Sequence, residues 1–329
     1  MKFRPSIERS KAHQYDRIAR NLGEFISEQD LELFTNFNVD NHDMEKSRPQ
    51  PRDFQDVYGQ DEIKQDEEEV HRLENNEFDP NYQQKPRAAE YLTAAAITDG
   101  GWLEQEGYET KVSLASKYDD YINATDLIVT VTDKDGETIH LGIDVTTSQI
   151  DTEIDDKLRK VKNQIKKDKL PEVKYYSPEG KAKDQKGKLE IPKVTVAIDS
   201  EMLPELIRIH KGLKPGKTLD NHPMQAEFRQ EIIDQLIVNI EIIINNNLKK
   251  GSPEKSLDTP SDALSDDLNN LNNRQQIIVK DLQKTLSFVE NVRQKKNPRE
   301  RVSFSRARGN KILRKLAPKG TARVLEEMS

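Results

Sequence analysis

The chain has 329 residues, of which 33% are hydrophobic and 34% charged, with no cysteine and a formal net charge of −7. A globular domain carries roughly 45–50% apolar residues, so this chain is too polar to pack from end to end, and the lack of cysteine excludes disulfide scaffolds, thiolate metal sites and cysteine nucleophiles. No stretch approaches the roughly 20 apolar residues of a membrane span, and no apolar secretory segment follows the basic N-terminal residues, so we expect a cytoplasmic protein without a membrane partner.

Residues 1–84 are predicted to form one helix followed by a disordered acidic linker. Apolar side chains recur near helical spacing over residues 15–37, which predicts an amphipathic helix. The following stretch, 36–84, is polar, and its segment 53–79 has eleven Asp or Glu residues against two Lys or Arg residues. Low hydrophobicity combined with high charge predicts a segment that cannot bury enough apolar surface to fold.

Residues 85–249 are predicted to form a single α/β domain. Strong helix formers open it and stop at the pair Gly100 and Gly101. The expected elements are a helix at 88–97, strands at 108–115, 126–132 and 138–146, a helix at 150–165, a lysine-rich loop at 166–188, a strand at 192–199, and helices at 200–213 and 223–248. The order helix, three strands, helix, strand argues for one α/β core.

The C-terminal part is predicted to contain a linker at 250–267, followed by a helix and a basic tail at 268–329. Between Arg293 and Arg323 there are twelve Lys or Arg residues against one acid, Glu300. Such charge asymmetry predicts an arm that binds nucleic acid, DNA more than RNA, and the alternative is a solvated tail. The helix at 223–248 is apolar enough to predict a homodimer through it.

Two aspartates lie on neighbouring strands of the predicted core. Asp126 stands at the start of an apolar strand, and Asp144 lies inside the next one, between Ile143 and Val145. The connection at 133–137 contains Asp-Gly and suits a hairpin, so pairing of the strands brings the two aspartates near each other. Mg²⁺ prefers one or two carboxylates with water and phosphate oxygens, whereas a lone strand aspartate also caps turns or pairs with lysine. The pair therefore indicates either a hard-cation site or a structural role.

These carboxylates and the order of the elements resemble the PD-(D/E)XK, or restriction-endonuclease-like, nuclease superfamily. Its core is a helix, a three-stranded meander, a helix and a strand, with an acid in the first helix, an Asp opening the second strand and Asp/Glu-X-Lys in the third. Glu90, Asp126 and Asp144 stand at the matching positions of this sequence. The resemblance covers residues 85–200. It implies a core of that fold with extra C-terminal helices and disordered flanks, and Mg²⁺ or Mn²⁺ held by the three carboxylates.

The third strand departs from the motif, because Thr146 stands where the superfamily has its lysine. A threonine hydroxyl cannot act as the fixed cation that orients the attacking water and stabilises developing charge. Lys157, on the flank of the next helix, is the candidate replacement, and Lys160 is a second. Gln149 is a candidate polar ligand at the helix entrance. The alternative for both lysines is a solvated helix face.

Two functions follow from these observations. The leading hypothesis is a metal-dependent nuclease that hydrolyses phosphodiester bonds, with Glu90, Asp126, Asp144, Thr146 and Lys157 in its catalytic site. The alternative is a catalytically inactive module of the same fold that binds nucleic acid or a protein partner, and the missing lysine supports it. Carboxylates that converge on one position with a lysine nitrogen beside them favour the enzyme, and carboxylates that face apart favour the module.

Overall fold

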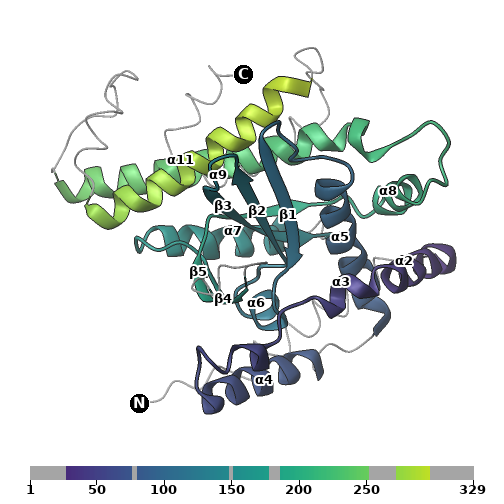
Figure 1. The fold of residues 1–329 in the computed structure, drawn as a ribbon, viewed down its shortest axis with the longest axis horizontal. Helices are drawn as coiled ribbons and strands as arrows, with labels where there is room; N and C mark the ends of the chain where they lie inside the picture. The colour runs from purple at the N-terminus through teal and green to yellow at the C-terminus, as the bar shows by residue number, and fades with distance from the viewer. Residues whose placement is uncertain (1–26, 76–79, 148–150, 178–185, 252–271, 297–329) are drawn as a thin grey trace.

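The computed structural model describes residues 27–75, 80–147, 151–177, 186–251 and 272–296 (Figure 1). The predicted helix residues 15–26, Gln149, most of the 250–267 linker and the tail from residue 297 onward lie outside this part of the chain. The described residues form a mixed α/β structure. Its centre is a four-stranded sheet with helices around it, and a second sheet has two strands.

The four-stranded sheet joins an antiparallel meander to one parallel strand. The strands are β1 (Tyr108–Leu114), β2 (Leu127–Asp133), β3 (Thr138–Thr146) and β6 (Lys193–Ala197), in the order β1-β2-β3-β6. β1, β2 and β3 pair antiparallel, whereas β6 pairs parallel with β3. The β2–β3 turn contains Gly136 at φ 82°, a left-handed conformation that glycine adopts without strain. The predicted strands and hairpin are confirmed.

Alternation along the strands gives the sheet two different faces. Val129 of β2 and Ile143 of β3 belong to the main core, which the helices α5 (Pro80–Thr98) and α9 (Met224–Gly251) share. Ile128, which points to the other face, belongs to a smaller cluster with residues of the two-stranded sheet. Because side chains alternate, Asp126 and Asp144 point away from the main core. The two candidate aspartates are therefore on the less apolar face of the sheet.

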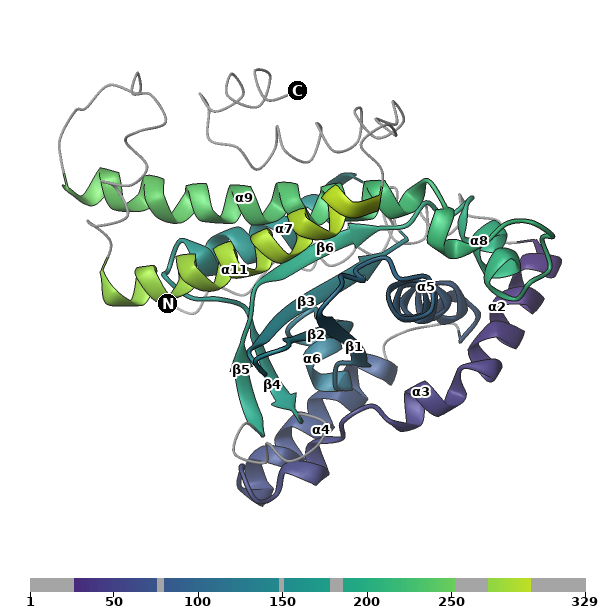
Figure 2. The same cartoon turned by 45° about the horizontal axis from the view of Figure 1, so that its top comes forward.

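Three helices follow β6 in the chain: α8 (Leu203–His210), α9 and α11 (Asn273–Lys296). α8 packs against α2 and α5, α9 contacts β6, and α11 contacts β3. α9 and α11 run side by side, and α7 (Asp151–Ile165) lies next to α9 (Figures 1 and 2). The Gln235 side chain of α9 accepts a hydrogen bond from the Thr195 backbone N–H (2.8 Å) and donates one to its carbonyl oxygen (2.6 Å). α9 thus satisfies backbone groups on the outer edge of β6.

The apolar run in α9 is covered by the protein's own chain. Its buried side chains are part of the main core together with those of α11; they include Phe228, Ile232, Leu236, Ile240 and Ile243. The run that predicted a homodimer is thus explained by packing within one chain, and it no longer requires a second copy. Among the described residues, no helix has both the length and the apolar character needed to cross a membrane.

The stretch predicted as an acidic linker is folded in its described part. It contains α3 (His42–Lys46), η1 (Pro51–Phe54) and α4 (Gln60–Asn75), and α2 (Glu28–Asp40) precedes them. Phe54, Ile63 and Val70 are buried, and the acids of α4 find lysine partners, as in the Asp66–Lys174 ion pair at 2.5 Å. The linker prediction was wrong here, because average composition hides a few well-spaced apolar residues and the partners that charged groups find elsewhere.

The lysine-rich loop and the residues before Asp126 also contain unpredicted structure. β4 (Glu172–Tyr176) and β5 (Gly187–Glu190) pair antiparallel within the segment predicted as loop. α6 (Lys117–Tyr121) is a short helix between β1 and β2, and the Ser116 hydroxyl caps it by accepting a hydrogen bond from the Asp119 N–H. None of these three elements is long enough for a periodic pattern to stand out.

Candidate metal centre

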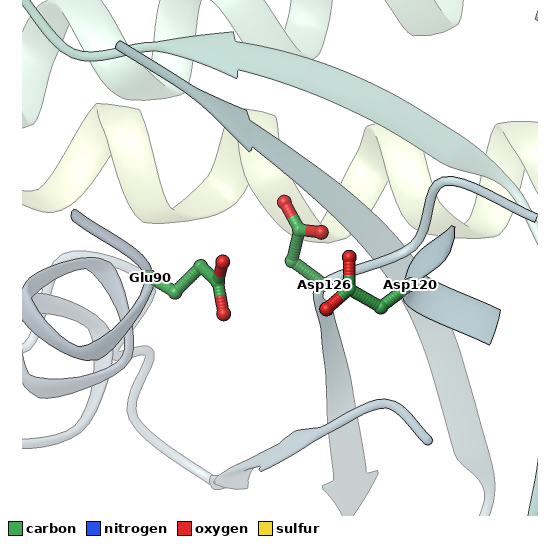
Figure 3. A group of neighbouring side chains, drawn as sticks. All are labelled: Glu90, Asp120 and Asp126. Carbon is green, nitrogen blue, oxygen red and sulfur yellow. The ribbon is translucent and has the colours of Figure 1, made fainter. Parts of the chain in front are cut away.

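Three carboxylates from different elements converge at one end of the sheet. Glu90 belongs to α5, Asp120 to α6, and Asp126 is the residue before β2 (Figure 3). One oxygen atom of each carboxylate lies within 4.8 Å of an oxygen of the other two. Glu90 and Asp126 are predicted site residues, whereas Asp120 is not. The name "acidic cluster" is used below for Glu90, Asp120 and Asp126.

A tight turn carries the chain from Asp120 to Asp126. Ala124 has φ 50°, a left-handed conformation that is unfavourable for an L-residue other than glycine. Lys193 of β6 is buried, and its Nζ donates to the carbonyl oxygens of Asn123 (2.7 Å) and Ala124 (3.2 Å). The ammonium group therefore stabilises the strained turn that brings the two aspartates to the same place.

Backbone hydrogen bonds hold Asp126 against the end of β3. Its N–H donates to the Ile143 carbonyl oxygen (3.0 Å), and its Oδ2 accepts from the Val145 N–H (2.6 Å). The residue is 6% exposed. Burial, followed by the charges of Asp120, Glu90 and Asp144, raises the pKa of Asp126 well above the ordinary value. The carboxylate is therefore fixed in position in an environment with excess negative charge.

Arg48, which lies between α3 and η1 in the chain, contacts two members of the acidic cluster. Its guanidinium lies 3.4 Å from Glu90 Oε2 and 3.3 Å from Asp120 Oδ2, and the side chain is 3% exposed. The same group donates to the Ala115 carbonyl oxygen (2.9 Å) and pairs with Glu45 (3.2 Å). Arg48 lies in the segment predicted as linker, so the sequence analysis did not identify it.

The positive charge of one guanidinium does not neutralise the three carboxylates of the acidic cluster. Burial, followed by Asp120, raises the pKa of Glu90 to about 8 even though Arg48 and Arg87 oppose the change. Burial also raises the pKa of Asp120, against the effect of Arg48. Because its pKa is about 8, Glu90 holds a proton near neutral pH unless another cation takes the place of that proton. Three carboxylate oxygens of this kind suit a hard divalent cation such as Mg²⁺ or Mn²⁺, which binds oxygen ligands.

Asp144 lies beside this cluster but has its own counter-ion. Its Oδ1 is 2.5 Å from Lys157 Nζ, and its side chain is 1% exposed while that of Lys157 is 30% exposed. Burial lowers the pKa of Lys157, but Asp144 and Asp126 outweigh burial, so the net pKa is raised and the ammonium stays charged. The predicted replacement lysine therefore contacts the predicted third-strand acid. Asp144 itself is not one of the three converging carboxylates.

The remaining predicted residues lie around this centre or outside the described chain. Thr146 is buried in β3 and pairs with Ala197 of β6. Lys160 is exposed on α7, one turn beyond Lys157. Gln149 lies outside the described residues. Lys157 is therefore the predicted lysine that reaches the carboxylates.

Two contributors to the site are absent from the sequence prediction. Asp120 lies in the same acidic block as Asp126, so a count of nearby acids could have found it. Arg48 carries no local signal, because its partners are 42 and 72 residues away in the chain. No protein-family model, curated protein or solved structure matches this chain.

Proposed function

We propose that this protein is a metal-dependent nuclease with a restriction-endonuclease-like core that hydrolyses phosphodiester bonds. The observation that carries the proposal is the convergence of Glu90, Asp120 and Asp126 next to the Asp144–Lys157 ion pair. The oxygen ligands for a hard cation and a fixed ammonium group are side by side in this arrangement. Each can stabilise the charge that develops when a water attacks a phosphate diester.

The order of the elements supports the same proposal. α5, the β1–β2–β3 meander, α7 and β6 follow one another as in the superfamily that the sequence resembles, with β4 and β5 inserted before β6. Glu90 lies on the first helix of this series, Asp126 opens β2 and Asp144 lies in β3. These are the positions that the resemblance implies for the three acids.

Each residue has a distinct role in this proposal. Glu90, Asp120 and Asp126 would hold the cation, with the hydrogen bond from the Val145 N–H fixing the orientation of Asp126. A Mg²⁺ or Mn²⁺ ion held by these residues would lower the pKa of a water and would stabilise charge on the scissile phosphate. Lys157, which forms an ion pair with Asp144, would orient the attacking water and stabilise negative charge on the phosphate oxygens.

Lys157 weakens the case for an inactive module. That alternative depends on Thr146 standing where the superfamily has a lysine. The Lys157 ammonium group belongs to α7 and lies 2.5 Å from Asp144 Oδ1, so it supplies the same charge from a different element. The alternative function is therefore kept as an outcome of the experiment below.

The basic tail is the proposed contact to the substrate backbone. Its lysines and arginines between Arg293 and Arg323 would bind phosphates through salt-sensitive contacts. Residues 297–323 lie outside the described chain, so this part of the proposal depends on charge alone. It applies to DNA and RNA, with DNA as the first substrate to test.

The experiment measures cleavage of plasmid DNA and of a structured RNA with Mn²⁺, with Mg²⁺ and with EDTA. We expect cleavage of one substrate that requires the metal and that Asp126→Asn lowers by about 100-fold or more. The matched control is Asp135→Asn, an exposed aspartate of the hairpin turn that should behave as wild type. Cleavage that survives in Asp126→Asn contradicts the proposal, and Mn²⁺ binding without cleavage favours the inactive module.

A further inference from the structure

Arg48 makes more contacts than a counter-ion requires. Its Nη1 donates to the Ala115 carbonyl oxygen at 2.9 Å and lies 3.3 Å from Asp120 Oδ2. Its Nη2 lies 3.4 Å from Glu90 Oε2, and its Nε lies 3.2 Å from Glu45 Oε2. The guanidinium thus contacts four acceptors, and two of them belong to the acidic cluster.

The other two acceptors hold the guanidinium from outside the cluster. Ala115 directly follows β1, so its carbonyl oxygen is part of the rigid sheet region, and its N–H is bonded to the Asp126 carbonyl oxygen at 2.8 Å. Glu45 is itself fixed, because the Tyr91 hydroxyl donates to its Oε2 at 3.0 Å. Arg48 is therefore held in place whether or not the cluster needs it.

We propose that Arg48 is a positioning residue that keeps Glu90 and Asp120 turned toward Asp126, so that the N-terminal segment around α3 completes the metal centre. The inference deepens the proposed function and rests on it where the cation is concerned. Without the Arg48 guanidinium, nothing directs these two partly buried carboxylates to one position, and repulsion between their ionised forms favours rotamers that separate them. With it, both oxygens are directed to one position before any cation arrives.

Arginine is suited to this task and lysine is not. A guanidinium is planar, permanently charged and has five N–H donors in a fixed fork, whereas an ammonium is a compact point charge with three donors. The four acceptors around Arg48 lie in different directions. A lysine at this position keeps the charge but loses part of the geometry.

The first arm of the test uses the full chain without metal. Crystal structures of wild type, Arg48→Met and Arg48→Lys are compared for the positions of the Glu90 and Asp120 carboxylates. We expect the two carboxylates to leave the cluster in Arg48→Met and to stay closer to their wild-type positions in Arg48→Lys. Unchanged carboxylates in Arg48→Met overturn the proposal.

The second arm measures Mn²⁺ affinity by calorimetry. Loss of a group that orients metal ligands costs about 10- to 100-fold in affinity, so we expect Arg48→Met to bind Mn²⁺ at least about tenfold more weakly and Arg48→Lys to fall between it and wild type. Arg208→Met is the matched control, because Arg208 pairs with Asp30 of α2 at 3.0 Å and ties another N-terminal helix to the core. Its affinity should stay at the wild-type level.

The outcomes separate this inference from the proposed function. If Arg48→Met binds Mn²⁺ as tightly as wild type or more tightly, Arg48 is only a competing counter-ion and the proposal is wrong. If Arg48→Met does not fold, Arg48→Lys decides, since wild-type affinity in that variant excludes a need for the fork. If wild type binds no Mn²⁺, the proposed metal centre fails, and the metal-free structures still decide whether Arg48 positions the carboxylates.

Discussion

The candidate metal centre has two halves, the acidic cluster and the Asp144–Lys157 ion pair, and they balance their charge in different ways. The acidic cluster of Glu90, Asp120 and Asp126 faces a single guanidinium, which also pairs with Glu45. Asp144, by contrast, forms a direct ion pair with Lys157 at 2.5 Å. The first half therefore has spare negative charge that attracts a cation, and the second half holds a cation of its own in a fixed place. In the proposed function, the first half is the metal site and the second half supplies the charge stabilisation.

The largest expected effect comes from removing the cation of the second half. Lys157→Met should lower metal-dependent cleavage about 100-fold, because it removes the ammonium group proposed to stabilise charge on the phosphate. Its Mn²⁺ affinity should equal or exceed that of wild type, whereas Asp126→Asn should lose both affinity and cleavage. Single-turnover cleavage and calorimetry measure the two quantities, and Lys160→Met is the control on the exposed face of α7. Equal losses of Mn²⁺ affinity in Lys157→Met and Asp126→Asn would show that the halves are one unit.

A smaller effect is expected from pH on the stability of the first half. Because the pKa of Glu90 is about 8 in the folded protein against an ordinary 4.5, the folded state binds the proton more tightly than the unfolded state. Stability of the metal-free protein should therefore fall as the pH rises through this range. The melting temperature should drop by several degrees in wild type and by less in Glu90→Gln.

Mn²⁺ should act against this pH effect. A divalent cation supplies the charge that the lost protons no longer balance, so the rise in melting temperature on adding Mn²⁺ should be larger at pH 8.5 than at pH 6. Thermal unfolding in matched buffers of equal ionic strength measures both effects. The same rise at both pH values would contradict a binding site built from carboxylates with raised pKa values.

The smallest expected effect concerns the turn that joins Asp120 to Asp126. Ala124→Gly should stabilise the protein by about 0.5 kcal/mol, because relief of the left-handed strain outweighs the greater entropy of glycine in the unfolded chain. Gly136→Ala is the reverse control: φ there is 82°, so it should destabilise by about 1 kcal/mol. Urea unfolding measures both changes. A destabilised Ala124→Gly would mean that the Lys193 contacts already remove the strain.

Prediction from the sequence succeeds where the signal is local and repeated. The three strands of the meander, the Asp-Gly turn and the apolar stripes of α7 and α9 follow from residue spacing, and the structure has them. The site is a mixed result. Glu90 and Asp126 meet, and Lys157 reaches Asp144, but Asp120 replaces Asp144 as the third converging carboxylate.

The acidic N-terminal segment shows why the other contacts of the fold and of the site could not be predicted from the sequence. Its composition is that of a disordered linker, yet Arg48 becomes buried among four acceptors and Asp66 pairs with Lys174. Charged residues are expensive to bury alone and become acceptable only when partners arrive from distant parts of the chain. No short window of the sequence contains both members of the Asp66–Lys174 pair, or both Arg48 and a member of the acidic cluster.

The sequence by itself determined the order of the core elements and the faces on which their apolar and acidic side chains lie, because helical and strand periodicity act over a few residues. Only the tertiary structure decided which carboxylates meet, which lysine joins them and that Arg48 holds two of them together. Lys157 lies 13 positions from Asp144, and the two cluster carboxylates that Arg48 contacts lie 42 and 72 positions from it, so the energies of these contacts depend on a three-dimensional arrangement that local spacing does not encode.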